Sequence, residues 1–138
     1  GPCRVLPSDM RVRIQAANAS RYPDLVALCK EPLFHDEQQD VLLNPSLIVE
    51  VLSPSTEAYD RGAKFASYRR LPSLEEYVLV SQGRPQIEVY ARQPDGRWLL
   101  GETGGMDAEV TFESLGCRVA LREIYAKVEF DPAETNSS

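Results

Sequence analysis

Apolar and polar positions along the first half of the chain form short runs that predict strands. Residues 11–15 alternate and predict a half-exposed strand, whereas residues 24–29 are almost continuously apolar and predict a buried one. Residues 46–52 are apolar at both parities, which is typical of a central strand covered on both faces. The polar residues 16–22 predict a turn, and residues 30–45 predict a surface loop.

The strongest helical signal follows the central strand. Residues 57–70 predict a helix that stops before Pro72, and either Ser53 or Thr56 is placed to cap its start. The remaining pattern predicts a strand at 76–81, a hairpin of 86–92 and 97–101, one or two short strands within 110–121 and a short helix at 121–127. This order of elements indicates a layered α/β domain.

The chain has 138 residues, which suits a single domain over residues 1–130 followed by a polar tail at 131–138. Its formal net charge of −6 excludes an overall basic coat for nucleic acid, but a local basic strip stays open. No apolar run approaches the roughly 20 residues of a membrane span. The first ten residues also lack the apolar stretch of a signal peptide. We therefore expect no membrane partner.

The cysteines and the single histidine offer little chemistry. Cys3, Cys29 and Cys117 are odd in number and no two have metal-ligand spacing, so we expect reduced thiols in a cytoplasmic protein. His35 lies in a polar loop and predicts a solvated side chain. A nucleophile such as Ser53 or Cys29 has no evident activating base nearby.

The most informative residue is Glu50, within the apolar run at 46–52. On a strand covered on both faces, a carboxylate must be paired, protonated or bound to a metal. Asp24 opens another buried run directly after Pro23, so the two carboxylates could converge on a hard divalent cation. The pattern leaves a second interpretation equally open, in which Glu50 is hydrogen-bonded to a backbone N–H or an arginine.

The helix predicted at 57–70 places Asp60, Lys64 and Tyr68 on one face at four-residue spacing. The simpler interpretation is a surface ion pair between Asp60 and Lys64, worth about 0.3–0.5 kcal/mol. In the functional interpretation this face turns toward the carboxylates, and Lys64 orients a water or neutralises a phosphate.

Basic side chains gather on the same helix, at Arg61, Lys64, Arg69 and Arg70. Such a run is usually solvated, and the alternative is a local surface for nucleic acid. Gly62 interrupts this run and costs up to about 1 kcal/mol relative to alanine inside a helix. Four aromatic residues fit packing better than base stacking: Tyr22, Tyr90, Trp98 and Tyr125.

The order of these motifs resembles the Uma-two family of bacterial restriction endonuclease candidates, within the PD-(D/E)xK nuclease superfamily. The motifs are Tyr22-Pro23-Asp24, IVEVLSPST at 48–56, Asp60-x-x-x-Lys64-x-x-x-Tyr68 and EYVLV at 76–80. The resemblance covers about residues 4–128. It implies a restriction-endonuclease-like α/β fold with a mixed central sheet, a flanking helix and a β-hairpin extension.

The resemblance also implies roles for individual residues. Asp24 and Glu50 match the family's two metal ligands, and Leu52 stands where the superfamily has its lysine. The matching lysine is then Lys64, on the following helix, which we expect to act as the catalytic base or as a stabiliser of developing charge. The implied activity is hydrolysis of phosphodiester bonds in nucleic acid, expected to be DNA, with Mg²⁺ or Mn²⁺. We further expect Asp60 and Tyr68 to lie beside the site, and Arg61, Arg69 and Arg70 of the basic helix to contact nucleic acid.

A different class of function stays open. Family members carry a further N-terminal portion that this chain is expected to lack, which would leave an exposed sheet edge able to form a homodimer. Together with the acidic net charge, this favours a catalytically inactive nuclease-like domain that serves as a binding or assembly module. Retention of Asp24, Glu50 and Lys64 favours the enzyme.

Overall fold

A mixed six-stranded sheet forms the centre of the computed structural model, which describes residues 3–6, 10–36 and 40–126. Its strands, in spatial order, are β1 (Arg4–Leu6), β4 (Leu25–Leu28), β6 (Leu47–Val51), β7 (Glu76–Val80), β8 (Gln86–Arg92) and β9 (Trp98–Gly104). Strands β6 and β7 are parallel, and the other neighbours are antiparallel. A parallel pair requires a crossover connection, which the helical segment between β6 and β7 supplies.

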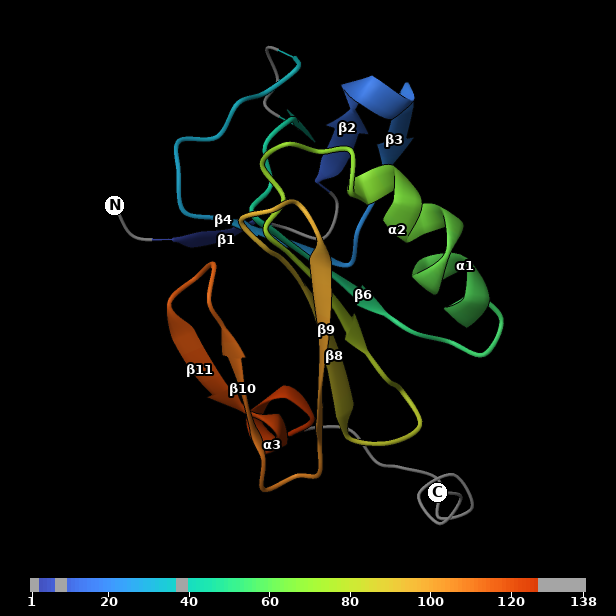
Figure 1. Ribbon diagram of the computed structural model, residues 1–138, viewed down its shortest axis with the longest axis vertical. Helices are drawn as coiled ribbons and strands as arrows, with labels where there is room; N and C mark the ends of the chain where they lie inside the picture. The colour runs from blue at the N-terminus through green and yellow to red at the C-terminus, as the bar shows by residue number, and fades with distance from the viewer. Residues whose placement is uncertain (1–2, 7–9, 37–39, 127–138) are drawn as a thin grey trace.

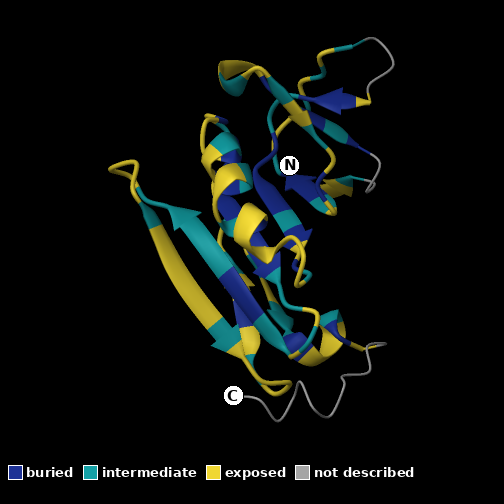
Figure 2. Cartoon of the chain, turned by 90° about the vertical axis from the view of Figure 1, so that its right-hand side faces the viewer, coloured by how far each residue is buried: buried dark blue, intermediate teal, exposed yellow. Residues whose placement is uncertain are grey.

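That crossover contains two short helices, α1 (Glu57–Arg61) and α2 (Ala63–Tyr68). The sequence predicts one helix over 57–70, and the structure divides it at Gly62. A Cβ atom at Gly62 would lie 3.1 Å from the Ala58 carbonyl oxygen, which explains why glycine suits the break. Figure 1 shows both helices along one side of the sheet, and Figure 2 shows their outer surface exposed.

The opposite face of the sheet is covered by a hairpin of β10 (Glu109–Phe112) and β11 (Cys117–Ala120), followed by α3 (Leu121–Ile124). Side chains of Leu47 and Val78 pack there with Val110 and Leu121. On the helix face, Ile48 and Tyr77 pack with Phe65 and Tyr68 in a separate cluster. Alternate side chains of β6 and β7 therefore point to opposite faces of the sheet and pack into two separate cores.

A small third sheet consists of β2 (Arg11–Ile14), β3 (Ala19–Arg21) and β5 (Val41–Leu42). A short 3-10 helix, Gln15–Ala17, and Asn18 with a φ of 49° connect β2 to β3. The prediction of a turn throughout 16–22 is therefore wrong for β3, and β5 lies within the loop predicted at 30–45. Both strands are too short to be recognised without their pairing partner β2.

The expectation of three reduced thiols is also wrong, because a disulfide joins Cys3 to Cys29. Strand β1 is absent from the predicted elements, yet it pairs with β4 so that Arg4 faces Leu28, which brings the two cysteines together. Cysteine content therefore no longer supports a reducing compartment. His35 is exposed, as predicted, and the tail at 131–138 lies outside the described residues. None of the helices in the described part of the chain is long and apolar enough to cross a membrane.

Candidate active site

Two carboxylates meet where β4 and β6 run side by side. The antiparallel register pairs Leu25 with Val49, which brings Asp24 opposite Glu50. The backbone N–H of Asp24 donates to Glu50 Oε1 over 3.2 Å, and the N–H of Val51 donates to Asp24 Oδ2 over 2.7 Å. Each strand thus holds the carboxylate of the other, and Glu50 is buried with 3% of its surface exposed.

Lys64 reaches this pair from α2. Its ammonium group contacts Glu50 Oε2 and lies 2.9 Å from Asp60 Oδ1. Asp60 is buried, so the pair formed by Asp60 and Lys64 is not the solvated surface pair of the simpler interpretation. The structure therefore brings Asp24, Glu50, Asp60 and Lys64 together, as the spacing and the resemblance lead one to expect.

The protonation of this cluster reflects its burial and its charges. Burial raises the pKa of Glu50, the Lys64 ammonium partly offsets this, and the nearby charge of Asp24 raises it further. Burial alone would lower the pKa of Lys64, but its hydrogen bonds and ion pairs with Glu50 and Asp60 outweigh that effect and raise it. Lys64 is thus held in its charged form, which favours stabilisation of negative charge over proton abstraction.

Two further groups support Asp60 and line the cluster. Thr56 Oγ1 donates to Asp60 Oδ2 over 3.2 Å, and the buried Tyr77 hydroxyl donates to the Asp60 carbonyl over 2.9 Å. The Tyr68 hydroxyl is buried without a hydrogen-bond partner among the described residues. Burial, followed by the charge of Glu50, raises the Tyr68 pKa, so this phenol remains a proton donor.

The arginines expected to contact nucleic acid differ in their surroundings. Arg61 is paired with Glu57 over 2.9 Å and with the buried Glu88 over 2.5 Å. Arg69 is exposed and lies over the Phe65 ring, 4.6 Å from its centroid, and Arg70 is exposed after the end of α2. Arg61 thus has an internal role that the sequence pattern does not reveal, because Glu88 comes from the distant strand β8.

Sequence reasoning missed two residues beside the cluster, Arg21 and Tyr59. The Arg21 guanidinium lies 5.6 Å from the centroid of the Tyr59 ring, and Lys64 Nζ lies 5.5 Å from the same centroid. Tyr59 is 42% exposed. The motif Tyr22-Pro23-Asp24 begins only after Arg21. Because the pattern predicts a turn in place of β3, the sequence gives no indication that Arg21 lies beside the helix.

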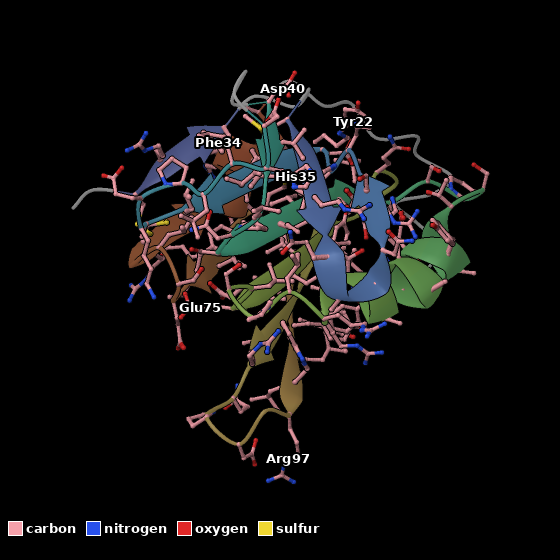
Figure 3. All side chains as sticks on the ribbon, turned by 90° about the horizontal axis from the view of Figure 1, so that it is seen from above. Tyr22, Phe34, His35, Asp40, Glu75 and Arg97 are labelled. Atoms are coloured by element: carbon pink, nitrogen blue, oxygen red, sulfur yellow. A yellow bond between two sulfur atoms is a disulfide. The ribbon has the colours of Figure 1, made fainter. Side chains whose placement is uncertain are left out.

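The prediction of packing roles for four aromatic residues holds for three of them. Tyr90 and Trp98 pack against the helix-side core, and Tyr125 is buried in the opposite core. Tyr22 is 65% exposed, so its packing interpretation is wrong. Figure 3 labels Tyr22 near the outer edge of the molecule, directly after the end of β3.

The two carboxylates of Asp24 and Glu50 suit a hard cation only if water and substrate oxygens complete its coordination. Within residues 3–6, 10–36 and 40–126, no cluster of three or more His, Cys, Asp or Glu side chains is arranged to hold a metal ion. Mg²⁺ usually takes one or two carboxylates and fills its other positions with water and phosphate oxygens. Asp24 and Glu50 fit that requirement, and a divalent cation between them would relieve the repulsion that raises the Glu50 pKa.

A polar hollow of about 330 Å³ lies beyond the ends of β6 and β7. Its lining includes Ser53, Glu57 and Arg84, and does not include Asp24, Glu50 or Lys64. The residues that line this hollow follow Glu50 closely in the sequence, but the side chains of the carboxylate cluster do not line it.

The sheet, the crossover helices and the carboxylate–lysine cluster together define a mixed α/β domain with a buried, charged site. Residues 1–122 match the Uma2 family, described as "Putative restriction endonuclease". The chain therefore belongs to this family.

Two curated relatives come from Synechocystis and are both named as uncharacterized proteins. One is 42% identical over 108 residues, which cover 78% of this chain and 61% of the relative. The other is 37% identical over 130 residues, which cover 94% of this chain and 67% of the relative. The chain thus spans about three fifths to two thirds of the length of these relatives.

A solved structure has the same fold. It is described as a "putative nuclease belonging to DUF820" from Anabaena variabilis, and it superposes with a TM-score of 0.70. The match covers 90% of this chain and 68% of the other, at 15% sequence identity. At that identity the likeness establishes the architecture, a mixed α/β domain around a six-stranded sheet.

Proposed function

We propose that this domain hydrolyses phosphodiester bonds of nucleic acid, with Mg²⁺ or Mn²⁺ held by Asp24 and Glu50. The observation that carries the proposal is the contact of Lys64 with Glu50, directly beside Asp24. A lysine from the crossover helix thereby contacts one of two carboxylates that lie opposite each other on adjacent strands. Membership of a family described as "Putative restriction endonuclease" supports the same activity.

Each side chain of the cluster has a distinct task in this reaction. A bound divalent ion would polarise the phosphate and lower the pKa of the attacking water. Lys64, held in its charged form, stabilises negative charge that develops on the phosphate. Asp60 fixes the position of Lys64 through their 2.9 Å contact. The Tyr68 hydroxyl, which has no hydrogen-bond partner in the described part of the chain, lies in the same buried region.

DNA is the substrate that we propose, bound through local rather than overall charge. The net charge of −6 repels nucleic acid at a distance, so binding depends on a few cations near the cluster. Arg69 and Arg70 are exposed at the end of α2 and are proposed to contact the phosphate backbone.

Cleavage assays on supercoiled plasmid, single-stranded DNA and RNA test the proposal, each with Mg²⁺, Mn²⁺ or EDTA. Glu50→Ala removes a proposed ligand, and Lys64→Met removes the charge that accompanies it. Glu102→Ala is the matched control, because Glu102 is an exposed carboxylate on the edge strand β9. We expect metal-dependent cutting by the wild type and by Glu102→Ala, and at least a hundredfold loss in the other two variants.

Two results would contradict this function. Cutting that persists in Glu50→Ala would show contamination or a wrongly chosen carboxylate. The absence of cutting by every protein, together with no thermal shift on addition of Mn²⁺, would favour the inactive binding module instead.

A further inference from the structure

Among the described residues, Arg21 differs from Lys64 and Arg61 in having no anionic partner. Lys64 is held by Glu50 and Asp60, and Arg61 by Glu57 and Glu88. No carboxylate of the described residues lies within ion-pair distance of Arg21. Its Nε atom is buried without a hydrogen-bond partner in the same part of the chain. A partly buried guanidinium in this state is prepared to receive an anion.

Arg21 also lies close enough to the cluster for its charge to act there. It is among the charges that influence the Tyr68 hydroxyl, together with those of Glu50 and Asp60. It ends β3 and precedes Asp24 by only three residues. An anion bound by Arg21 would thus sit next to the proposed metal ligands, where a neighbouring phosphate of a substrate strand would fall.

Tyr59 provides an aromatic surface at the same place. Its ring is 42% exposed, and the charged ends of Arg21 and Lys64 both lie within 5.6 Å of the ring centroid. A partly exposed ring with two cations close to it attracts a nucleotide in two ways, since the base can stack on the exposed part of the ring while the cations meet its phosphates. A base can stack on this ring only when it is not stacked and paired inside a duplex.

We propose that Arg21 and Tyr59 form a subsite for one unpaired nucleotide beside the carboxylate pair. Arg21 binds the phosphate and Tyr59 stacks on the base. The inference rests on the proposed nuclease function and narrows its substrate to single-stranded nucleic acid or unpaired ends. Arg21 and Tyr59 act as binding and positioning residues, and neither takes part in bond cleavage.

Binding in EDTA tests this subsite without interference from cleavage. The probes are a fluorescein-labelled 12-nucleotide DNA strand, its 12-base-pair duplex and an RNA strand of the same sequence, measured by fluorescence anisotropy. The variants are Arg21→Ala, Tyr59→Ala and Tyr59→Phe. Arg97→Ala is the matched control, because Arg97 is an exposed cation on the turn between β8 and β9 and its side chain is 86% exposed. Circular dichroism checks that each variant is folded.

We expect the wild type to bind the single strands more tightly than the duplex. Arg21→Ala and Tyr59→Ala should each weaken single-strand binding about tenfold, and Tyr59→Phe, which keeps the ring, should regain most of the affinity. Arg21→Ala should also reduce the slope of affinity against salt by about one charge. Arg97→Ala removes the same charge and should change affinity less than twofold.

Several outcomes would overturn the subsite: equal effects of Arg21→Ala and Arg97→Ala, no loss in Tyr59→Ala, preference for the duplex, or no binding of any probe. The nuclease function is judged separately, by cleavage with metal. Metal-dependent cleavage by the wild type with unaffected Arg21 and Tyr59 variants would refute the subsite alone. Single-strand binding that depends on both residues, without cleavage, would refute the nuclease alone.

Discussion

Glu50 and Glu76 are equally buried, each with 3% of its surface exposed, but they lie on opposite faces of the central sheet. Glu50 faces the crossover helices and meets Lys64, with Asp24 and Asp60 close by. Glu76 faces the β10–β11 hairpin, where the backbone N–H and the hydroxyl of Ser114 both donate to its Oε1. One carboxylate belongs to a cluster of charges, and the other holds a loop in place.

This difference teaches that burial alone does not mark a functional carboxylate. The hydrogen bonds from Ser114 compensate Glu76 for the loss of water with neutral partners on a single loop. Glu50 stays in an unfavourable environment, because burial and Asp24 raise its pKa while Lys64 opposes them. Ionisable groups held in such conflict are enriched at functional sites.

The largest expected effect is the loss of activity in Glu50→Gln, compared with Glu76→Gln. Loss of a metal ligand should lower kcat/KM for nucleic-acid cleavage about a thousandfold, because several kcal/mol of transition-state stabilisation disappear. Glu76→Gln should keep the rate per folded molecule within about threefold, since Glu76 contacts no group of the cluster. Initial rates, corrected for the folded fraction, measure both. Similar losses in the two variants would mean that the burial they share, rather than the charged partners of Glu50, accounts for the loss of activity.

The sequence predicts the main sheet better than the small one, for a physical reason. Strands β6 and β7 are covered on both faces, so their continuous apolar runs at 46–52 and 76–81 are visible without knowledge of the fold. Strands β1, β3 and β5 are two or three residues long. Strands β1 and β5 pair with strands far along the chain, and β3 pairs with the neighbouring strand β2. Their pairing stabilises them, and local propensity does not reveal pairing.

The candidate site divides in the same way. Glu50 could be singled out because it interrupts an apolar run, and Lys64 because its spacing from Asp60 and Tyr68 repeats a helical turn. Glu76 could not be recognised as buried, because it is the first residue of its strand and follows Glu75. Two adjacent glutamates at the start of a strand are typical of an exposed strand end. The pairing of Arg61 with Glu88 joins a helix to a strand 27 positions away, which no local pattern contains.

The next effect is smaller and concerns stability, for which Glu76 should matter more than Glu50. Glu76→Ala leaves the N–H and hydroxyl of Ser114 without their acceptor and should lower the free energy of unfolding by about 1–3 kcal/mol. Ser114→Ala removes the hydroxyl donor only and should cost about 1 kcal/mol. Urea denaturation of both single variants and the double variant gives the coupling energy between the two residues. Additive losses would show that the Ser114 contact does not account for the burial of Glu76.

The smallest effect concerns the link between the sheet and the cluster through Tyr77. Its hydroxyl, from the helix-facing side of β7, donates to the carbonyl of Asp60 and so fixes the turn of α1 that carries this carboxylate. Tyr77→Phe should lower the free energy of unfolding by about 1 kcal/mol, because the buried carbonyl loses its side-chain donor. Cleavage should slow severalfold as well, since Asp60 positions Lys64, whereas Glu76→Ala should leave the rate of folded protein unchanged. Tyr90→Phe is the matched control, because Tyr90 packs against the same Phe65 ring and no hydrogen bond of its hydroxyl is found in the described residues. A loss of stability in Tyr77→Phe without any change in rate would show that Thr56 and Lys64 suffice to hold Asp60, and that the helix-side sheet face supports the site only by packing.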